Sequence, residues 1–177
     1  MGQKPGDASI ETMSTEVMPA VTSGLTHQRI VVVAARYNEK YTTALLQNCL
    51  DELAQCAPGV EVEVVRVPGA FEVPLMVTRA ICCGAETPDA VIALGVILRG
   101  STAHADLIGE AITRELMRTS CRTRKPIIHE VLLLDNEQQA EERCLGERLN
   151  RGREAARAAI EMVNLIGAQN EKCNFNK

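Results

Sequence analysis

Four apolar runs of strand length alternate with segments of helical periodicity, and this alternation constrains the fold more than any other feature of the chain. The predicted strands occupy residues 29–36, 60–65, 89–98 and 126–134. The first and third runs are almost unbroken, which is typical of strands buried on both faces of a sheet. A segment of helical periodicity follows each predicted strand, so the pattern predicts four strand–helix units.

The helices have recognisable starts and stops. Asn38 is the expected N-cap of the first helix, and Gly167 is the expected stop of the last. The second and third helices run through 75–81 and 107–116, and two short helices are expected near the end, from Asn136 and through 155–163. Because right-handed crossovers place a helix over each pair of parallel strands, an α/β fold follows: a flavodoxin-like three-layer sandwich with a four-stranded parallel sheet.

A length of 177 residues suits one domain, expected over 28–167. Residues 1–27 are predicted to form a mobile arm, and the polar residues 168–177 a frayed tail. Residues 1–24 lack the charged-then-apolar order of a secretory signal, and no run is long enough to span a bilayer. We therefore expect a cytoplasmic protein.

Composition and charge exclude several partners and cofactors. The net charge of −4 and an aromatic content of 2% argue against nucleic-acid binding. Seven cysteines form no CxxC pair and the three histidines are dispersed, so we expect neither structural disulfides nor a metal site. Neither GxxxxGK[ST] nor GxGxxG occurs, which leaves nucleotide binding without a motif.

Ligands of open α/β sheets collect at the carboxyl ends of the strands. Four segments are predicted to meet at that edge, namely 36–38, 67–72, 99–104 and 134–136. The same alternation also occurs in flavodoxin-like signalling domains. Those domains need an acidic cluster at the strand ends, where Arg36 and Arg99 stand instead, so we rank this hypothesis last.

The segment after the third strand is the most informative. Gly100 permits a turn, and Ser101 and Thr102 lie at the mouth of a helix, where free amides favour an anion such as phosphate. His104 follows closely and could transfer protons near neutral pH. From this segment alone, simple capping by Ser101, Thr102 and Asp106, with His104 a surface residue, is an equal alternative.

Four motifs in register resemble the lumazine synthase family. They are 67–74 (VPGAFEVP), 93–106 (ALGVILRGSTAHAD), 137–143 (EQQAEER) and 150–152 (NRG), within a resemblance that covers 29–165. The resemblance implies condensation of 5-amino-6-(D-ribitylamino)uracil with 3,4-dihydroxy-2-butanone 4-phosphate to 6,7-dimethyl-8-ribityllumazine, with release of phosphate and water. This is the penultimate step of riboflavin biosynthesis, and it needs no cofactor.

The resemblance also assigns roles by position. His104 corresponds to the proton-transfer histidine, Arg143 to the phosphate-binding arginine, and Tyr37 to a ring that stacks on the pyrimidine. The residues that it places at the substrates are Tyr37, Asn38, Gly69, Ala70, Phe71, Glu72, Ile97, Leu98, Gly100, Ser101, Thr102, His129, Arg143, Arg151 and Glu154. Considered from the sequence alone, the alternatives stay open that Tyr37 is a half-buried core residue and Glu72 a first-turn acid, and a solvated helix-face acid is an equal alternative for Glu154.

The sequence departs from the family pattern at several positions. His129 and Glu130 replace a Phe-Gly pair, Ala105 replaces an aromatic residue, 133–134 replace threonines, and Arg151 replaces a lysine. We expect these changes to cluster on one wall of the site. They motivate an alternative hypothesis, a non-catalytic paralogue that binds lumazine or flavin or forms a structural shell.

The family builds its site between neighbouring subunits, so the resemblance implies a homo-oligomer: a pentamer or an icosahedral capsid of twelve pentamers. It also implies that the N-terminal arm could add a strand to a neighbouring subunit, and it makes riboflavin synthase a candidate partner.

Overall fold

One parallel sheet of four strands organises the molecule, and its strand order is β2-β1-β3-β4. The computed structural model describes residues 26–175, so the predicted arm lies almost entirely outside the described residues. The strands are β1 (Thr26–Ala35), β2 (Gly59–Val67), β3 (Ala90–Leu98) and β4 (Ile127–Leu134). All three neighbouring pairs are parallel, so the predicted sheet is confirmed.

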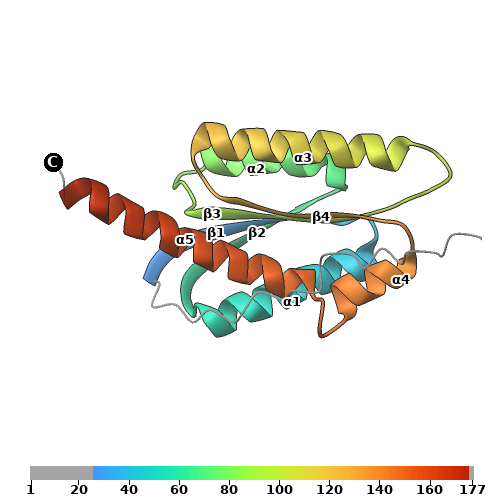
Figure 1. The fold of residues 1–177 in the computed structure, drawn as a ribbon, viewed down its shortest axis with the longest axis horizontal. Helices are drawn as coiled ribbons and strands as arrows, with labels where there is room; N and C mark the ends of the chain where they lie inside the picture. Colours follow the sequence, from blue (N-terminus) through green and yellow to red (C-terminus); the bar gives the residue numbers. More distant parts are fainter. Residues whose placement is uncertain (1–25, 176–177) are drawn as a thin grey trace, which may run out of the picture.

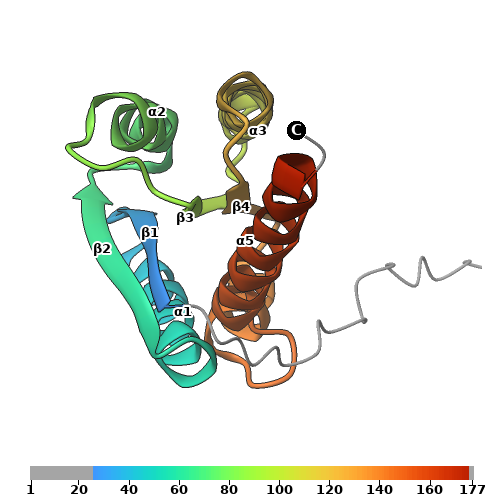
Figure 2. The same ribbon diagram turned by 90° about the vertical axis from the view of Figure 1, so that its left-hand side faces the viewer.

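Helices cover both faces of this sheet and complete the three predicted layers (Figures 1 and 2). One face carries α1 (Glu39–Cys56) and α5 (Arg151–Phe175), with α4 (Glu137–Ala140) and the π-helical turn η2 (Glu141–Leu145) beside them. The other face carries α2 (Val73–Cys83), the short 3-10 turn η1 (Ala70–Glu72) and α3 (His104–Thr123). None of the described helices is both long and apolar enough to cross a membrane.

Each layer of helices encloses its own aliphatic core. Along β1, Ile30 and Val32 pack against the α1–α5 side, whereas Val31 and Val33 pack against the α2–α3 side. All four are at most 2% exposed. A strand buried on both faces has no need of polar alternation, which explains the unbroken apolar run in the sequence.

The end of the chain differs from the prediction. Helix α5 continues through Gly167 to Phe175, so the predicted stop at Gly167 is wrong. A glycine stops a helix when it adopts a positive φ, and no glycine of the described chain does so. Within a helix a glycine costs only about 1 kcal/mol relative to alanine, which a long helix tolerates.

Helix α5 begins in close contact with α1, and Gly152 makes this contact possible. A Cβ atom at position 152 would lie 2.3 Å from the carbonyl oxygen of Leu45 and 3.1 Å from the amide nitrogen of Cys49. Only a residue without a side chain fits there. This contact fixes the first turn of α5, which carries two of the predicted site residues, Arg151 and Glu154.

Candidate active site

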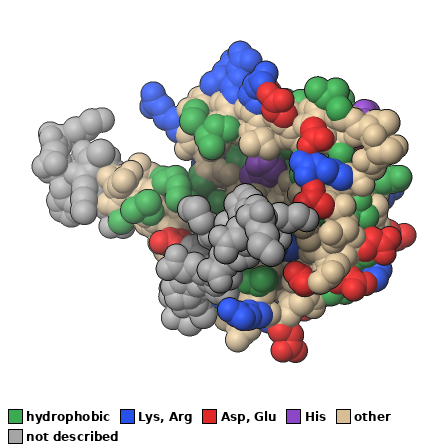
Figure 3. Space-filling view, turned by 45° about the vertical axis from the view of Figure 1, so that its right-hand side comes forward, with side chains coloured by type: hydrophobic (Ala, Val, Ile, Leu, Met, Phe, Trp, Pro, Cys, Tyr) green, Lys and Arg blue, Asp and Glu red, His purple; other side chains and the backbone are tan. Residues whose placement is uncertain are grey.

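A cavity of about 480 Å³ opens at the carboxyl edge of the sheet, where the sequence predicts the site. Figure 3 brings this edge forward and shows acidic and basic side chains lying next to one another on it. The residues that line the cavity are Tyr37, Asn38, Gly69, Ala70, Phe71, Glu72, Val96, Ile97, Leu98, Gly100, Thr102, His104, Ala105 and Ile108. The structure therefore brings most of the predicted residues together.

Tyr37 is presented to this cavity by the turn between β1 and α1. Asn38 adopts a left-handed conformation, with φ of 59°, which asparagine tolerates better than most residues. Its carbonyl accepts bonds from the amides of Tyr41 and Thr42, but its side chain makes no cap. The side-chain amide instead donates to the carbonyl of Val96 at 2.8 Å, so Asn38 occupies the predicted N-cap position without a side-chain cap. Tyr37 is 73% exposed, so it is not a core tyrosine.

The turn between β2 and α2 forms a second side of the cavity. The amide of Gly69 donates to Oε2 of Glu72 at 2.9 Å, so this carboxylate closes the turn on itself. The other oxygen of Glu72 is left as an acceptor for a ligand hydroxyl. Phe71 beside it is 64% exposed and, like Tyr37, offers an uncovered ring.

The third side is the turn before α3. Helix α3 begins at His104, its N-cap is Ala103, and no side chain caps it, so the predicted alternative of simple capping is not what the structure has. Thr102 Oγ1 accepts only a long bond, 3.5 Å, from the amide of His104. Amides in the first turn of a helix have no carbonyl partner within that helix, and they attract anions. Ser101 lies on this exposed turn but is not among the lining residues.

Arg99 ties this turn to the end of β4. Its guanidinium bonds Asp106 on α3, at 2.6 Å from Nη2, and also pairs with Asp135 after β4. The hydrogen bond from Arg99 lowers the pKa of Asp135, and the bond to Asp106 raises the pKa of Arg99. Arg99 therefore braces the edge of the site and does not line the cavity.

Besides Ser101, four predicted site residues do not line this cavity: His129, Arg143, Arg151 and Glu154. His129 faces α3, where Thr113 Oγ1 lies 2.8 Å from Nε2, and the amide of Val131 donates to Nδ1 at 3.1 Å. An Nδ1 atom that accepts a bond carries no proton, so the ring is neutral with its proton on Nε2. Burial lowers the pKa of His129, in agreement with this state.

The other three lie on the opposite side of the sheet, around Glu130. Arg151 and Glu154 form an ion pair of 2.5 Å on the first turn of α5, and Arg143 lies on η2. Glu154 is 7% exposed, which excludes the solvated helix-face alternative. His129 faces α3, whereas Glu130 and Arg151 lie on the α1–α5 side, so the prediction that the substituted positions cluster on one wall is wrong.

Some lining residues were not predicted. Val96, Ala105 and Ile108 complete the apolar part of the cavity. Ile108 lies one helical turn after His104 and therefore on the same side of α3, a spacing that could have indicated it.

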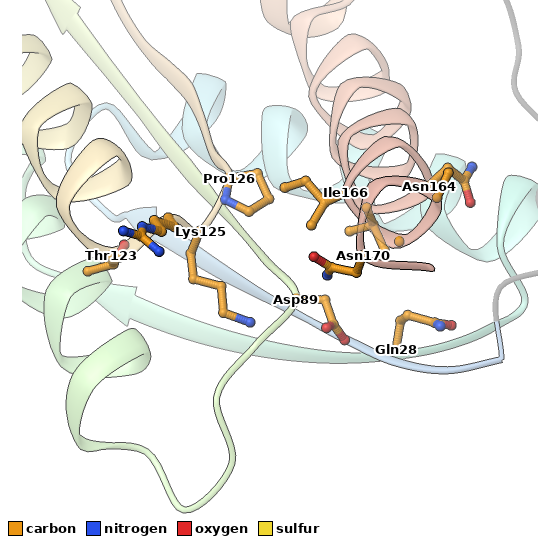
Figure 4. Close-up of a pocket in the computed structure, with 12 residues that line it drawn as sticks. Gln28, Asp89, Thr123, Lys125, Pro126, Asn164, Ile166 and Asn170 are labelled. Atoms are coloured by element: carbon orange, nitrogen blue, oxygen red, sulfur yellow. The ribbon is translucent and has the colours of Figure 1, made fainter. Parts of the chain in front are cut away.

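A larger cavity, of about 630 Å³, opens at the other edge of the sheet (Figure 4). Lys125, Asp89 and Asn170 point into it. It lies at the amino ends of the strands, where α/β sheets do not normally place their ligands. Among the described residues, no group of three or more histidine, cysteine, aspartate or glutamate side chains is arranged to hold a metal ion.

Comparison with known proteins gives one consistent result. A family model described as 6,7-dimethyl-8-ribityllumazine synthase matches residues 27–167. Two curated relatives are the 6,7-dimethyl-8-ribityllumazine synthases of two strains of Thermus thermophilus. Each is 38% identical over 143 residues, which cover 79% of this chain and 88% of the relative.

Proposed function

This chain belongs to the 6,7-dimethyl-8-ribityllumazine synthase family, and we propose that it catalyses the condensation that gives the family its name. It joins 5-amino-6-(D-ribitylamino)uracil to 3,4-dihydroxy-2-butanone 4-phosphate as a transferase of riboflavin biosynthesis. The observation that carries this function is the cavity at the carboxyl edge, where Tyr37, His104 and the first turn of α3 meet.

The lining suits each part of the two substrates. The pyrimidine stacks on the exposed ring of Tyr37, and the ribityl hydroxyls lie along residues 69–72, where Glu72 keeps a free acceptor oxygen. Ser101 and Thr102 bring the phosphate to the amides of α3. Residues 97–98 and Gly100 form the floor between these groups.

His104 transfers the protons of the reaction. The amine of the pyrimidine attacks the ketone, water leaves to give an imine, phosphate is eliminated, and the ring closes. Each of these steps moves a proton, and an imidazole at the cavity wall can both donate and accept one. Holding two substrates against this imidazole supplies the rest of the rate enhancement.

We infer that a neighbouring copy of the chain completes the site. Arg143, Arg151, Glu154 and His129 lie away from the cavity of their own subunit, and a phosphate dianion needs a cation that this cavity lacks among its lining residues. The exposed rings of Tyr37 and Phe71 also call for a covering surface.

The assembly, in this proposal, is a cytoplasmic pentamer or a capsid of twelve pentamers. The N-terminal arm adds a strand to a neighbouring subunit, and riboflavin synthase is a candidate partner. In support, β2 is an edge strand whose outer side pairs with no described strand.

The test is a turnover assay that follows lumazine absorbance and free phosphate together. We expect equal amounts of both products, and a His104→Ala rate about 10²–10⁴-fold lower. Equal rates for the two proteins would remove His104 from the mechanism. Binding of the pyrimidine without phosphate release would favour the non-catalytic paralogue.

Mixed assemblies test the shared site. Co-expressed His104→Ala and Arg143→Ala chains should recover activity that neither variant has alone, because random mixing leaves about a quarter of the interfaces intact. Absence of recovery in verified mixed assemblies would place both residues in the site of one subunit.

A further inference from the structure

Glu130 is a carboxylate inside the layer of α1 and α5. It is paired in register with Leu94 of β3, which belongs to the core on that side. Ile128 and Leu132 lie two residues before and after Glu130 on β4, and therefore on the same face of the sheet. Both pack against the same core. Burial raises the pKa of Glu130 to about 7. Among the described residues, no hydrogen bond or ion pair holds this carboxylate.

Charges from two neighbouring elements act on it. Arg151 of α5 and Arg143 of η2 favour its ionised form, whereas Glu154 of α5 opposes it. The ion pair between Arg151 and Glu154 links two of these groups directly, at 2.5 Å. Glu130 therefore lies within the field of the arginine assigned above to the phosphate.

The remaining titratable neighbours are two thiols. Cys49 of α1 and Cys144 of η2 are fully buried. Burial first, and the charge of Glu130 second, raise the pKa of each thiol to about 12. Both thiols are consequently neutral at physiological pH and contribute no charge to the cluster.

We propose that Glu130 is a positioning residue for the phosphate end of the site, whose proton sets the net charge around Arg143 and Arg151. This inference rests on the proposed function, because Arg143 matters here as the phosphate ligand. With Glu130 ionised, its negative charge opposes the two arginines together with that of Glu154. Protonation of Glu130 removes one negative charge from this cluster.

The sign of the effect follows from this change of charge. A phosphate dianion binds more tightly when Glu130 is protonated, and its arrival near Arg143 favours proton uptake by Glu130. Affinity for the dianion should therefore be highest below pH 7 and weaken as the pH rises through about 7, where Glu130 ionises. The pyrimidine carries no phosphate, so its affinity should not follow this profile.

The probe is sulfate, which stays a dianion over the whole range and therefore reports only the protein's titration. We would measure its inhibition constant against the sugar phosphate from about pH 6 to 8.5, with the assembled enzyme. In the wild type this constant should rise about 3–10-fold with pH, the effect of one partly screened charge. In Glu130→Gln it should stay low and flat.

Two further variants keep the result interpretable. Glu130→Asp retains the carboxylate and should retain the slope, even if Glu130→Gln does not assemble. Glu142→Gln changes an exposed carboxylate of the same η2 turn, which accepts a hydrogen bond from Gln138, and should behave as the wild type. A wild-type slope in Glu130→Gln, or a flat profile in Glu130→Asp, would overturn the inference.

Failure of the proposed function is a separate outcome. If the wild type shows no turnover, calorimetric titration of the assembled protein with sulfate still measures the same pH dependence. If sulfate affinity depends on pH through Glu130 but there is no turnover, the anion site is supported and the proposed enzymatic activity is contradicted. If there is turnover but no such pH dependence, only the role of Glu130 is contradicted.

Discussion

Replacing Gly152 by alanine tests whether the close approach of α5 to α1 positions the phosphate-binding side of the site. The new Cβ atom would lie 2.3 Å from the carbonyl oxygen of Leu45, 3.1 Å from Cβ of Asn48 and 3.1 Å from the amide nitrogen of Cys49. Two of these three atoms are backbone, so no side-chain rotation relieves the overlap. Helix α5 must move away from α1.

The expected cost follows from two opposing effects. Overpacking of a well-packed contact costs about 1–3 kcal/mol, and a backbone overlap belongs at the upper end of that range. Removing a glycine from a helix returns at most about 1 kcal/mol. The overlap dominates, so Gly152→Ala should lower the free energy of unfolding by about 2 kcal/mol.

Gly167→Ala is the matched control, because it makes the same chemical change in the same helix. A Cβ atom at position 167 meets no atom within 4 Å, so only the helix propensity remains. This variant should be more stable than the wild type by about 0.5–1 kcal/mol.

The assay is urea unfolding followed by circular dichroism, with the assembly state of each variant checked by sedimentation. Gly152→Ala should also raise the KM for the sugar phosphate, because Arg151 and Glu154 flank the displaced position. If Gly152→Ala were as stable as the wild type, or if both variants shifted in the same direction, the reasoning would be refuted.

Two more predictions concern buried polar groups. Burial opposes the ionised form of Glu52, whereas the hydrogen bond from Arg157, at 2.7 Å, favours it, and the pKa of Glu52 is lowered. Glu52→Gln should therefore lower the free energy of unfolding by about 3 kcal/mol at neutral pH. The difference in stability between the wild type and Glu52→Gln should shrink as the pH falls and Glu52 is protonated. A difference in their unfolding midpoints that stays constant with pH would contradict this prediction. Because burial lowers the pKa of His129, the unfolded chain takes up its proton first, and stability should fall as the pH drops below about 6.5. His129→Gln should flatten this part of the profile, and an unchanged slope would show that another group causes it.

The sequence predicted the sheet and most of the cavity for related reasons. A strand buried on both faces has an unbroken apolar run in its sequence, and such a run clearly predicts a strand. The carboxyl ends of parallel strands must then meet at one edge of the sheet, which predicts where the cavity lies. The segments that carry Tyr37 and His104 were therefore found from their positions after two strands, whereas the role of Tyr37 came from the family resemblance. Gly167 misled the prediction because a glycine stops a helix only when its φ is positive, which the residue type does not determine.

The two faces of β4 illustrate a different limit. The run 127–134 is apolar on both sides, so no alternation in the sequence indicates which layer each residue faces. The packing of Ile128 and Leu132 with the α1–α5 core, and of Ile127 and Val131 with the α2–α3 core, decides it. Strand alternation alone places His129 and Glu130 on opposite faces, and these contacts decide that Glu130 faces the α1–α5 layer and His129 the α2–α3 layer.

That separation also strengthens the assignment of His104, since the chain has three histidines. His27 lies at the first residues of β1, at the amino edge and away from the cavity. His129 has both ring nitrogens engaged, by Thr113 and by the amide of Val131, and taking up a proton would cost it the second bond. A general acid–base group must exchange its proton without breaking the structure that holds it. Of the three, His104 alone lines the cavity and has a ring free of such bonds to the described residues, so proton transfer falls to it.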